Sequence, residues 1–373
     1  MAKNSAGNST STRNSASSSK NHVVSPSLRK RGRVQVVVDD SACLEPAVAE
    51  KNGIFVVPLE ITNTDNEVST SAISPLQLCA TYARALERSN DAGVIAIHVA
   101  KGLSATWSNA QTAASVLDRV EVIDTAARGA GVGAALGAAA IRAAKAAAAG
   151  ANLERCKAIV EDTLAHSTMW FSVPKLDSLR RGGRMSAGQA MWSDVLAMKP
   201  IVTVREGQLS VVAKCRTEAK VREKLVELAL AEVGATEEAP HVLIQHADAA
   251  EAADELLAVL DDALPDQTRY KVVDLAPALV IHTGLGAVAL SVISHGRGNE
   301  DINPVTDLND ASLDDIVHGR ASGSRAPFIT VAGKLPTWSS NRRKAIEAAE
   351  RMAQGLEEVQ KRDVRENSTD DDS

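Results

Sequence analysis

The sequence predicts a two-domain α/β protein, and two observations support this fold class. Over residues 34–160, short runs rich in Val and Ile alternate with helical patterns, which is typical of a mainly parallel sheet covered by helices on both faces. Over residues 161–295, strands joined by glycine turns are mixed with helices and predict a second α/β domain with an antiparallel or mixed sheet. The length of 373 residues is enough for two cores.

Helix signals and apolar runs define the first domain. Ser41 is expected to cap the first helix and Gly53 to end it, while Ser74 and Pro75 form a strong start for the second. Strands are expected at 34–40, 54–61, 94–99 and 120–124, and helices at 41–53, 75–89, 106–118 and 129–149.

The second domain is predicted from further runs of the same kind. Strands are expected at 169–173, on both sides of a Glu-Gly-Gln turn within 199–216, at 241–245 and at 270–275, and helices at 187–198, 217–233 and 249–261. The apolar run 278–293 completes the domain, and His282 is expected at the end of a strand there.

The chain ends differ in composition from both domains. Residues 1–33 are Ser-rich and basic without an acid, and residues 363–373 are acidic, so both are predicted to be disordered tails. Residues 296–362 are predicted to be an extension that contains a loop and a charged helix at 341–362. The basic cluster RKRGR could contact nucleic acid or acidic lipid, but such a run is more often only a solvated tail.

Composition restricts the function classes. The net charge of −6 gives no general reason to expect specific nucleic-acid binding. No apolar run could span a bilayer and no signal sequence is evident, so a cytoplasmic protein is expected. The 4 cysteines are far apart without a CxxC pair, which predicts buried, inert thiols rather than a metal site or disulfides.

Two hydroxyl-rich segments come just before predicted helices. In HVAKGLSATWSNAQ, Lys101, Ser104 and Thr106 surround a helix start, where N–H groups and the helix dipole favour a carboxylate or phosphate. In STSAISP, Thr70 and Ser71 have the corresponding place in the preceding unit. Ligands of open parallel sheets bind beyond the carboxyl ends of strands, so the two segments could meet at one ligand. The alternative is that Ser104 serves only as a helix cap.

Enzyme functions are weaker alternatives. Ser104 could be the nucleophile of a small-molecule hydrolase or transferase, but the local sequence GLSAT lacks the G-x-S-x-G pattern. The glycines at Gly129–Gly133 match part of a dinucleotide-binding pattern, which would suit an oxidoreductase. Close packing of a helix is the preferred explanation of those glycines, because four residues separate them from the preceding strand.

Three further residues could contact an anion. Arg184, in RRGGRMS, could clamp a phosphate, dock an acidic partner or belong to a solvated hairpin. His282 precedes two glycines, which suggests backbone near a ligand or simply a tight turn around a structural histidine. Arg216 lies between a predicted strand and helix, where it could pair with a carboxylate or flank the helix.

The ordered set of these motifs resembles the DegV family of bacterial fatty-acid-binding proteins. The resemblance covers about residues 34–295 and rests on VVVDDSACLEP, TSAISP, HVAKGLSATWSNAQTA, VEVID, LDSLRRGGRMS, MKPIVTVREGQLSVVAKCRT and LVIHTGLGAVAL.

The resemblance implies a carrier without a catalytic residue, a metal or a cofactor. A long-chain, palmitate-like fatty acid would lie in an apolar tunnel between the domains, with its carboxylate held by hydroxyls. The carrier would present this acid to a separate ATP-dependent fatty-acid kinase and carry the acyl phosphate, with roles in phospholipid metabolism and with transient membrane contact possible. Since aromatic residues make up only 2% of the chain, the tunnel is expected to be aliphatic.

The resemblance also implies a set of site residues. The family's Thr-Ser pair falls on Thr70 and Ser71, and its LSGT turn falls on residues 103–106, with Ala105 in place of glycine. Lys101 stands where the family has a serine, so its ammonium is a hypothetical substitute for that hydroxyl. The remaining expected residues are His282 in a turn with Leu285 for proline, Arg216 near the head group, and Arg184 for docking the kinase.

Overall fold

The computed structural model describes residues 32–64, 67–126, 129–174, 176, 179–180, 182–185, 198–234 and 239–294. The N-terminal tail up to residue 31, the extension 296–362 and the acidic tail lie outside the described residues. The helix expected at 187–198 also lies outside them, apart from its last residue.

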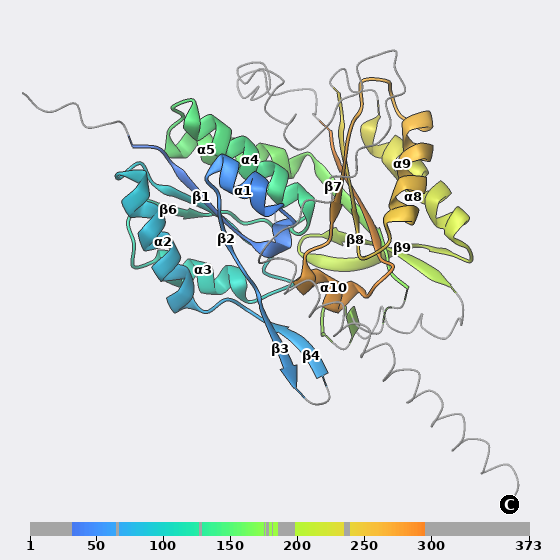
Figure 1. The fold of residues 1–373 in the computed structure, drawn as a ribbon, viewed down its shortest axis with the longest axis horizontal. Coiled ribbons are helices and arrows are strands. Elements are labelled where there is room, and N and C mark those ends of the chain that lie inside the picture. The colour runs from blue at the N-terminus through green and yellow to red at the C-terminus, as the bar shows by residue number, and fades with distance from the viewer. Residues whose placement is uncertain are drawn as a thin grey trace, which may run out of the picture. The chain divides into compact units, whose positions relative to one another are not determined.

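The first sheet is parallel throughout, as predicted (Figure 1). Its strand order is β2 (Phe55–Val57), β1 (Gln35–Asp39), β5 (Val94–Ile97) and β6 (Val120–Val122). Five helices cover it: α1 (Pro46–Asn52), α2 (Pro75–Ser89), α3 (Thr106–Ala114), α4 (Ala134–Ala148) and α5 (Leu153–Ala165).

Alternation along β1 explains why both faces of this sheet are covered. Val37 packs in a cluster with α2 and α3, whereas Val36 and Val38 belong to the opposite cluster with α1, α4 and α5. Successive side chains of a strand point to opposite faces, so an uninterrupted apolar strand requires helices on both. Ser74 accepts a hydrogen bond from the Gln77 N–H and Pro75 begins α2, which confirms the predicted start of that helix.

Two local predictions in the first domain were wrong. The strand predicted at 54–61 ends at Val57, before Pro58, and a separate hairpin follows, formed by β3 (Glu60–Thr64) and β4 (Glu67–Ser71). Thr70 and Ser71 therefore lie on a strand and not on a loop. Ser41 lies within a short 3₁₀ helix, η1 (Asp40–Ala42), and does not cap α1, because its hydroxyl donates to Asp39.

The glycine-rich segment and the helix after it also differ from the prediction. Helix α4 begins at Ala134 and not at residue 129, since Gly129 and Gly133 have positive φ angles. Helix α5, which was not predicted, packs along α4, and Cys156, Val160 and Leu164 join the core beneath the first sheet. The chain enters the second sheet directly afterwards, at Ser167.

The second sheet is mixed, as predicted. Its strand order is β11 (Arg269–Asp274), β10 (His241–His246), β12 (Val288–Ile293), β7 (Ser167–Ser172), β8 (Lys199–Arg205) and β9 (Gln208–Cys215), and only the pair β10–β11 is parallel. Helices α8 (Glu218–Val233) and α9 (Ala250–Ala263) cover one face, where Trp170 is buried. Met169 and Phe171 point to the other face and pack in a cluster with the start of α4.

His282 lies on a helix and not at the end of a strand. Pro277 begins the short helix α10 (Pro277–Thr283), and the N–H of Gly284 closes it on the Val280 carbonyl with a φ of 79°. The apolar composition of 278–293 is shared by a buried helix and a buried strand, so it does not separate the two.

Candidate functional site

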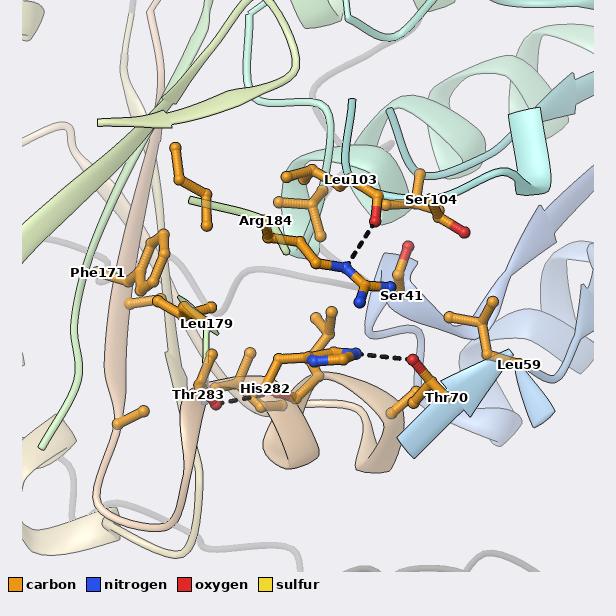
Figure 2. Close-up of a pocket in the computed structure, with 18 of the residues that line it drawn as sticks. Ser41, Leu59, Thr70, Leu103, Ser104, Phe171, Leu179, Arg184, His282 and Thr283 are labelled. Carbon is orange, nitrogen blue, oxygen red and sulfur yellow. Dashed lines mark hydrogen bonds between the residues drawn. The ribbon is translucent and has the colours of Figure 1, made fainter. Parts of the chain in front are cut away.

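A cavity lies between the carboxyl ends of β1 and β5 and the inner face of the second sheet (Figure 2). It contains about 780 Å³ of empty space, part of it open to solvent. The position of this cavity agrees with the rule that open parallel sheets bind ligands beyond the carboxyl ends of their strands.

Most of the cavity wall is aliphatic. Strand alternation turns Met169 and Phe171 of β7 inward, and Phe171 is the only Phe, Tyr or Trp among the described lining residues. The other apolar lining residues are Leu59, Val99, Leu103, Val132, Leu179, Leu209, Leu275, Ala278, Leu279, Ala287 and Ala289. Such a surface suits a hydrocarbon chain, because it offers contacts and no polar group that would need a partner.

Polar side chains gather at one end of the cavity. Figure 2 shows Ser41, Thr70, Arg184 and His282 directed toward one another, with Phe171 at a distance from them. Thr70 Oγ1 and His282 Nε2 lie 2.7 Å apart, which joins β4 to α10 by a hydrogen bond. Thr283 lines the cavity too, but its hydroxyl donates to the Leu279 carbonyl of its own helix.

Ser104 lies just before α3 and also lines the cavity. Its Oγ accepts a hydrogen bond from the Thr106 N–H at 3.2 Å and lies 3.0 Å from the Thr106 hydroxyl. It thus satisfies one of the N–H groups at the beginning of α3. Ser104 also lines the cavity, directly after Leu103, whose carbonyl accepts the hydrogen bond from Arg184.

Arg184 gives the polar end its charge. Its Nε donates to the Leu103 carbonyl at 3.1 Å, and it is the only residue with a permanent charge among the described lining residues. Burial lowers the pKa of Arg184, but a guanidinium stays protonated in proteins. An anion at this end would therefore meet a partly buried cation.

His282 is neutral at physiological pH. Burial and then the nearby Arg184 cation lower its pKa to about 4. A neutral imidazole has one donor and one acceptor nitrogen, so His282 orders Thr70 without adding a second charge. The cavity therefore offers one cation surrounded by uncharged hydrogen-bonding groups.

Sequence reasoning missed Ser41 as a site residue. Ser41 lines the cavity, and its N–H and hydroxyl both donate to Asp39. The fully buried Asp39 also accepts from the Val99 N–H at 2.8 Å and pairs with His98, which contacts Tyr82. Ser41 lies two residues after the end of β1, the neighbour of β5 in the sheet, so the rule that pointed to Ser104 also applies here.

Three predicted site residues do not line the cavity. Because side chains alternate along β4, Ser71 points away from Thr70's side, and its hydroxyl donates to Glu60 at 3.4 Å. Lys101 pairs with Asp124 at 3.0 Å and lies over the Trp107 ring, with 49% of its side chain exposed. Arg216 is exposed after the last residue of β9.

The geometry does not support the two enzyme alternatives. Among the described residues, no histidine is hydrogen-bonded to Ser104, and His98 is already engaged by Asp39 and Tyr82. At the supposed dinucleotide loop, a Cβ on Gly131 would lie 2.5 Å from the Ala100 side chain. The N–H of Ala134 beyond it donates to Gln245 at 2.8 Å, so these glycines permit close packing.

The chemistry of metals and thiols adds no candidate within the described residues. They contain no group of three or more His, Cys, Asp or Glu side chains that could hold a metal ion. Cys43, Cys156 and Cys215 are buried, and burial raises the pKa of the Cys43 thiol to about 12, which keeps it protonated and unreactive. No helix in the described part of the chain is long and apolar enough to cross a membrane.

Comparison with known proteins gives a consistent family signal. A family model described as "Uncharacterised protein, DegV family" matches residues 60–295. A DegV domain-containing protein of Corynebacterium glutamicum is 44% identical over 269 residues, which is 72% of this chain and 96% of the relative. A DegV domain-containing protein of Mycobacterium tuberculosis is 33% identical over 277 residues, covering 69% of this chain and 96% of the relative.

Solved structures show the same two-domain fold. The crystal structure of a DegV family protein from Corynebacterium glutamicum matches with a TM-score of 0.68 and 42% identity, over 72% of this chain and all of that one. A DegV family protein from Thermus thermophilus, described by its fatty-acid binding, matches with a TM-score of 0.64 and 26% identity, over 70% of this chain and 99% of that one.

Proposed function

The chain belongs to the DegV family, and from this premise we propose that it binds a long-chain fatty acid in the cavity between its two sheets. The acyl chain lies against the aliphatic wall, and the carboxylate lies at the polar end, near Arg184. The observation that carries the proposal is this division of one cavity into a long apolar wall and a single cationic end. The fatty-acid binding described for the Thermus thermophilus relative supports it.

The physical chemistry of the cavity agrees with such a ligand. Each buried CH₂ group contributes about 0.8 kcal/mol, so a long chain supplies most of the affinity. A carboxylate taken out of water needs hydrogen bonds or a paired charge, which Ser104, Thr70 and Arg184 can provide. The acyl chain of the ligand therefore determines how strongly the acid binds, and the polar end of the cavity determines the direction in which it lies.

The protein acts as a carrier in this proposal and not as an enzyme. It presents the bound acid to a separate ATP-dependent fatty-acid kinase and carries the acyl phosphate, with transient membrane contact during exchange. This part rests on the family resemblance alone. Arg184 is expected from the resemblance to dock the kinase, but it lines the cavity, which supports a role of its guanidinium in holding the head group instead.

Native mass spectrometry of the purified protein tests the binding step. We expect a co-purifying C14–C18 acid, or a one-to-one complex after palmitate is added. Arg184→Met should lower palmitate affinity by about tenfold or more, because hydrogen bonds to charged groups contribute about 1.5–3 kcal/mol. Arg216→Met is the matched control, since Arg216 is exposed after β9 and should leave the affinity unchanged.

Two results would contradict the proposal. A bound nucleotide in place of a lipid would favour the dinucleotide alternative. Esterase turnover that disappears in Ser104→Ala would instead show that the hydroxyl acts as a nucleophile.

A further inference from the structure

The turn that carries Ser104 meets the second sheet through two glycines. Gly102 lies within the turn, where the Ala100 carbonyl accepts hydrogen bonds from the N–H groups of Leu103 and Ser104 at 2.8 and 3.2 Å. Gly207 lies at the tip of the β8–β9 hairpin. A Cβ added to Gly102 would lie 2.0 Å from the Gly207 carbonyl oxygen. The two backbones are therefore in direct contact, with no room for a side chain at Gly102.

The hairpin side of this contact also requires glycine. Glu206 and Gly207 have φ angles of 51° and 71°, which suits the two-residue turn between paired Arg205 and Gln208. A Cβ on Gly207 would lie 3.1 Å from the Ala126 side chain and 3.3 Å from the Gly102 nitrogen. Any other residue at 207 would combine an unfavourable backbone conformation with a tight contact.

The same two segments form part of the cavity wall. Leu103 and Ser104 directly follow Gly102, and Leu209 lies two residues after Gly207. Arg184 joins them as well, because its Nε donates to the Leu103 carbonyl at 3.1 Å. A shift of the turn would therefore move the Ser104 hydroxyl and the support of Arg184 together.

We infer that the Gly102–Gly207 contact positions the Ser104 turn and thereby sets how strongly the cavity prefers a carboxylate to an uncharged head group. This rests on the proposed function and makes both glycines positioning residues. Hydrogen bonds weaken steeply when their geometry is distorted, whereas most of the aliphatic wall belongs to other elements and does not move with this turn. Displacing the turn should therefore cost head-group recognition more than chain binding.

The test compares palmitic acid with 1-hexadecanol, which has the same chain length and no charge. In Gly102→Ala we expect the preference for the acid over the alcohol to fall by about tenfold, because a hydrogen bond to a charged group contributes more than one to a neutral group. Gly207→Ala should change the preference in the same direction. If Gly102→Ala does not fold, the Gly207→Ala variant provides the test in its place.

Matched controls separate positioning from general loosening. Gly53 and Gly150 have φ angles of 68° and 97°, and a Cβ on either would meet nothing within 4 Å. Gly53→Ala and Gly150→Ala should strain the backbone and keep the wild-type preference. Equal weakening of both ligands in Gly102→Ala, or an unchanged preference in a folded variant, would overturn the inference. If the wild-type protein binds no palmitic acid, the proposed function fails first and the inference fails with it.

Discussion

The two ends of the cavity are built on different physical principles. The apolar wall comes from many residues of several elements. The polar end depends on a few groups, each with a defined partner: Thr70 with His282, and Arg184 with the Leu103 carbonyl. Under the proposed function, the wall supplies affinity and tolerates change, while the polar end supplies direction and does not.

The two ends also differ in what they do to the stability of the protein. Burying the aliphatic wall stabilises the folded state, because apolar area is removed from water. The polar end places His282 in surroundings that disfavour its charged form and keeps a guanidinium partly desolvated. The polar end is therefore the place where ligand recognition is expected to oppose stability.

The largest expected effect concerns the apolar wall. Affinity should rise by about two orders of magnitude from a C12 to a C16 fatty acid, since four more buried CH₂ groups contribute about 3 kcal/mol in total. Dissociation constants for the C12, C14 and C16 acids and the matching alcohols measure the gain in affinity for each added CH₂ group. The alcohols should show the same increment, because the chain and not the head group produces it. A flat acid series would contradict the division of roles.

The next effect concerns the polar end and acid pH. His282 has a pKa of about 4 when folded and about 6.5 when unfolded, so the unfolded state binds more protons between these values. The contribution of neutral His282 to the free energy of unfolding is complete above pH 6.5. As the pH falls toward 4, this free energy decreases by about 3 kcal/mol. Urea unfolding of the ligand-free protein should therefore show a smaller loss between pH 7 and pH 4 in His282→Gln than in the wild type.

His166→Gln, which changes a histidine outside the cavity, is the control for this measurement. The comparison must be made between variants, because burial raises the pKa of Asp40 to about 7 and gives a pH dependence of the opposite sign. If His282→Gln loses as much stability as the wild type, His282 is not held neutral in the folded protein.

The apolar patterns predicted the layers of the fold well and their fine structure less well. The parallel first sheet, the mixed second sheet and the capped start of α2 follow from runs and caps that act locally. The residues of the β3–β4 hairpin are mostly polar, so an apolar pattern does not predict it. The apolar run predicts a strand where α10 forms, because buried helices and buried strands share a composition. These errors changed the description of Thr70 and His282 without removing them from the cavity.

The site residues show the same limit more sharply. Sequence reasoning pointed to Thr70 and Ser71 as a pair, but only strand alternation decides that Thr70 lines the cavity and Ser71 contacts Glu60. The charge of Lys101 suggested a head-group role, whereas its partner Asp124 lies 23 positions away in the chain. Contacts between distant residues depend on the fold as a whole, and a local pattern does not contain them.

Lys101 gives the smallest expected effect and the sharpest distinction between sequence and structure. If the Lys101 ammonium takes the place of a family hydroxyl, the Lys101→Ala variant should bind palmitate more weakly than the wild type. Its contacts with Asp124 and Trp107 at an exposed position predict a change within about twofold, because surface ion pairs contribute little. Titrating Lys101→Ala beside Ser104→Ala decides between these outcomes. A loss as large as that of Ser104→Ala would place the ammonium at the head group and move the polar end toward the protein surface.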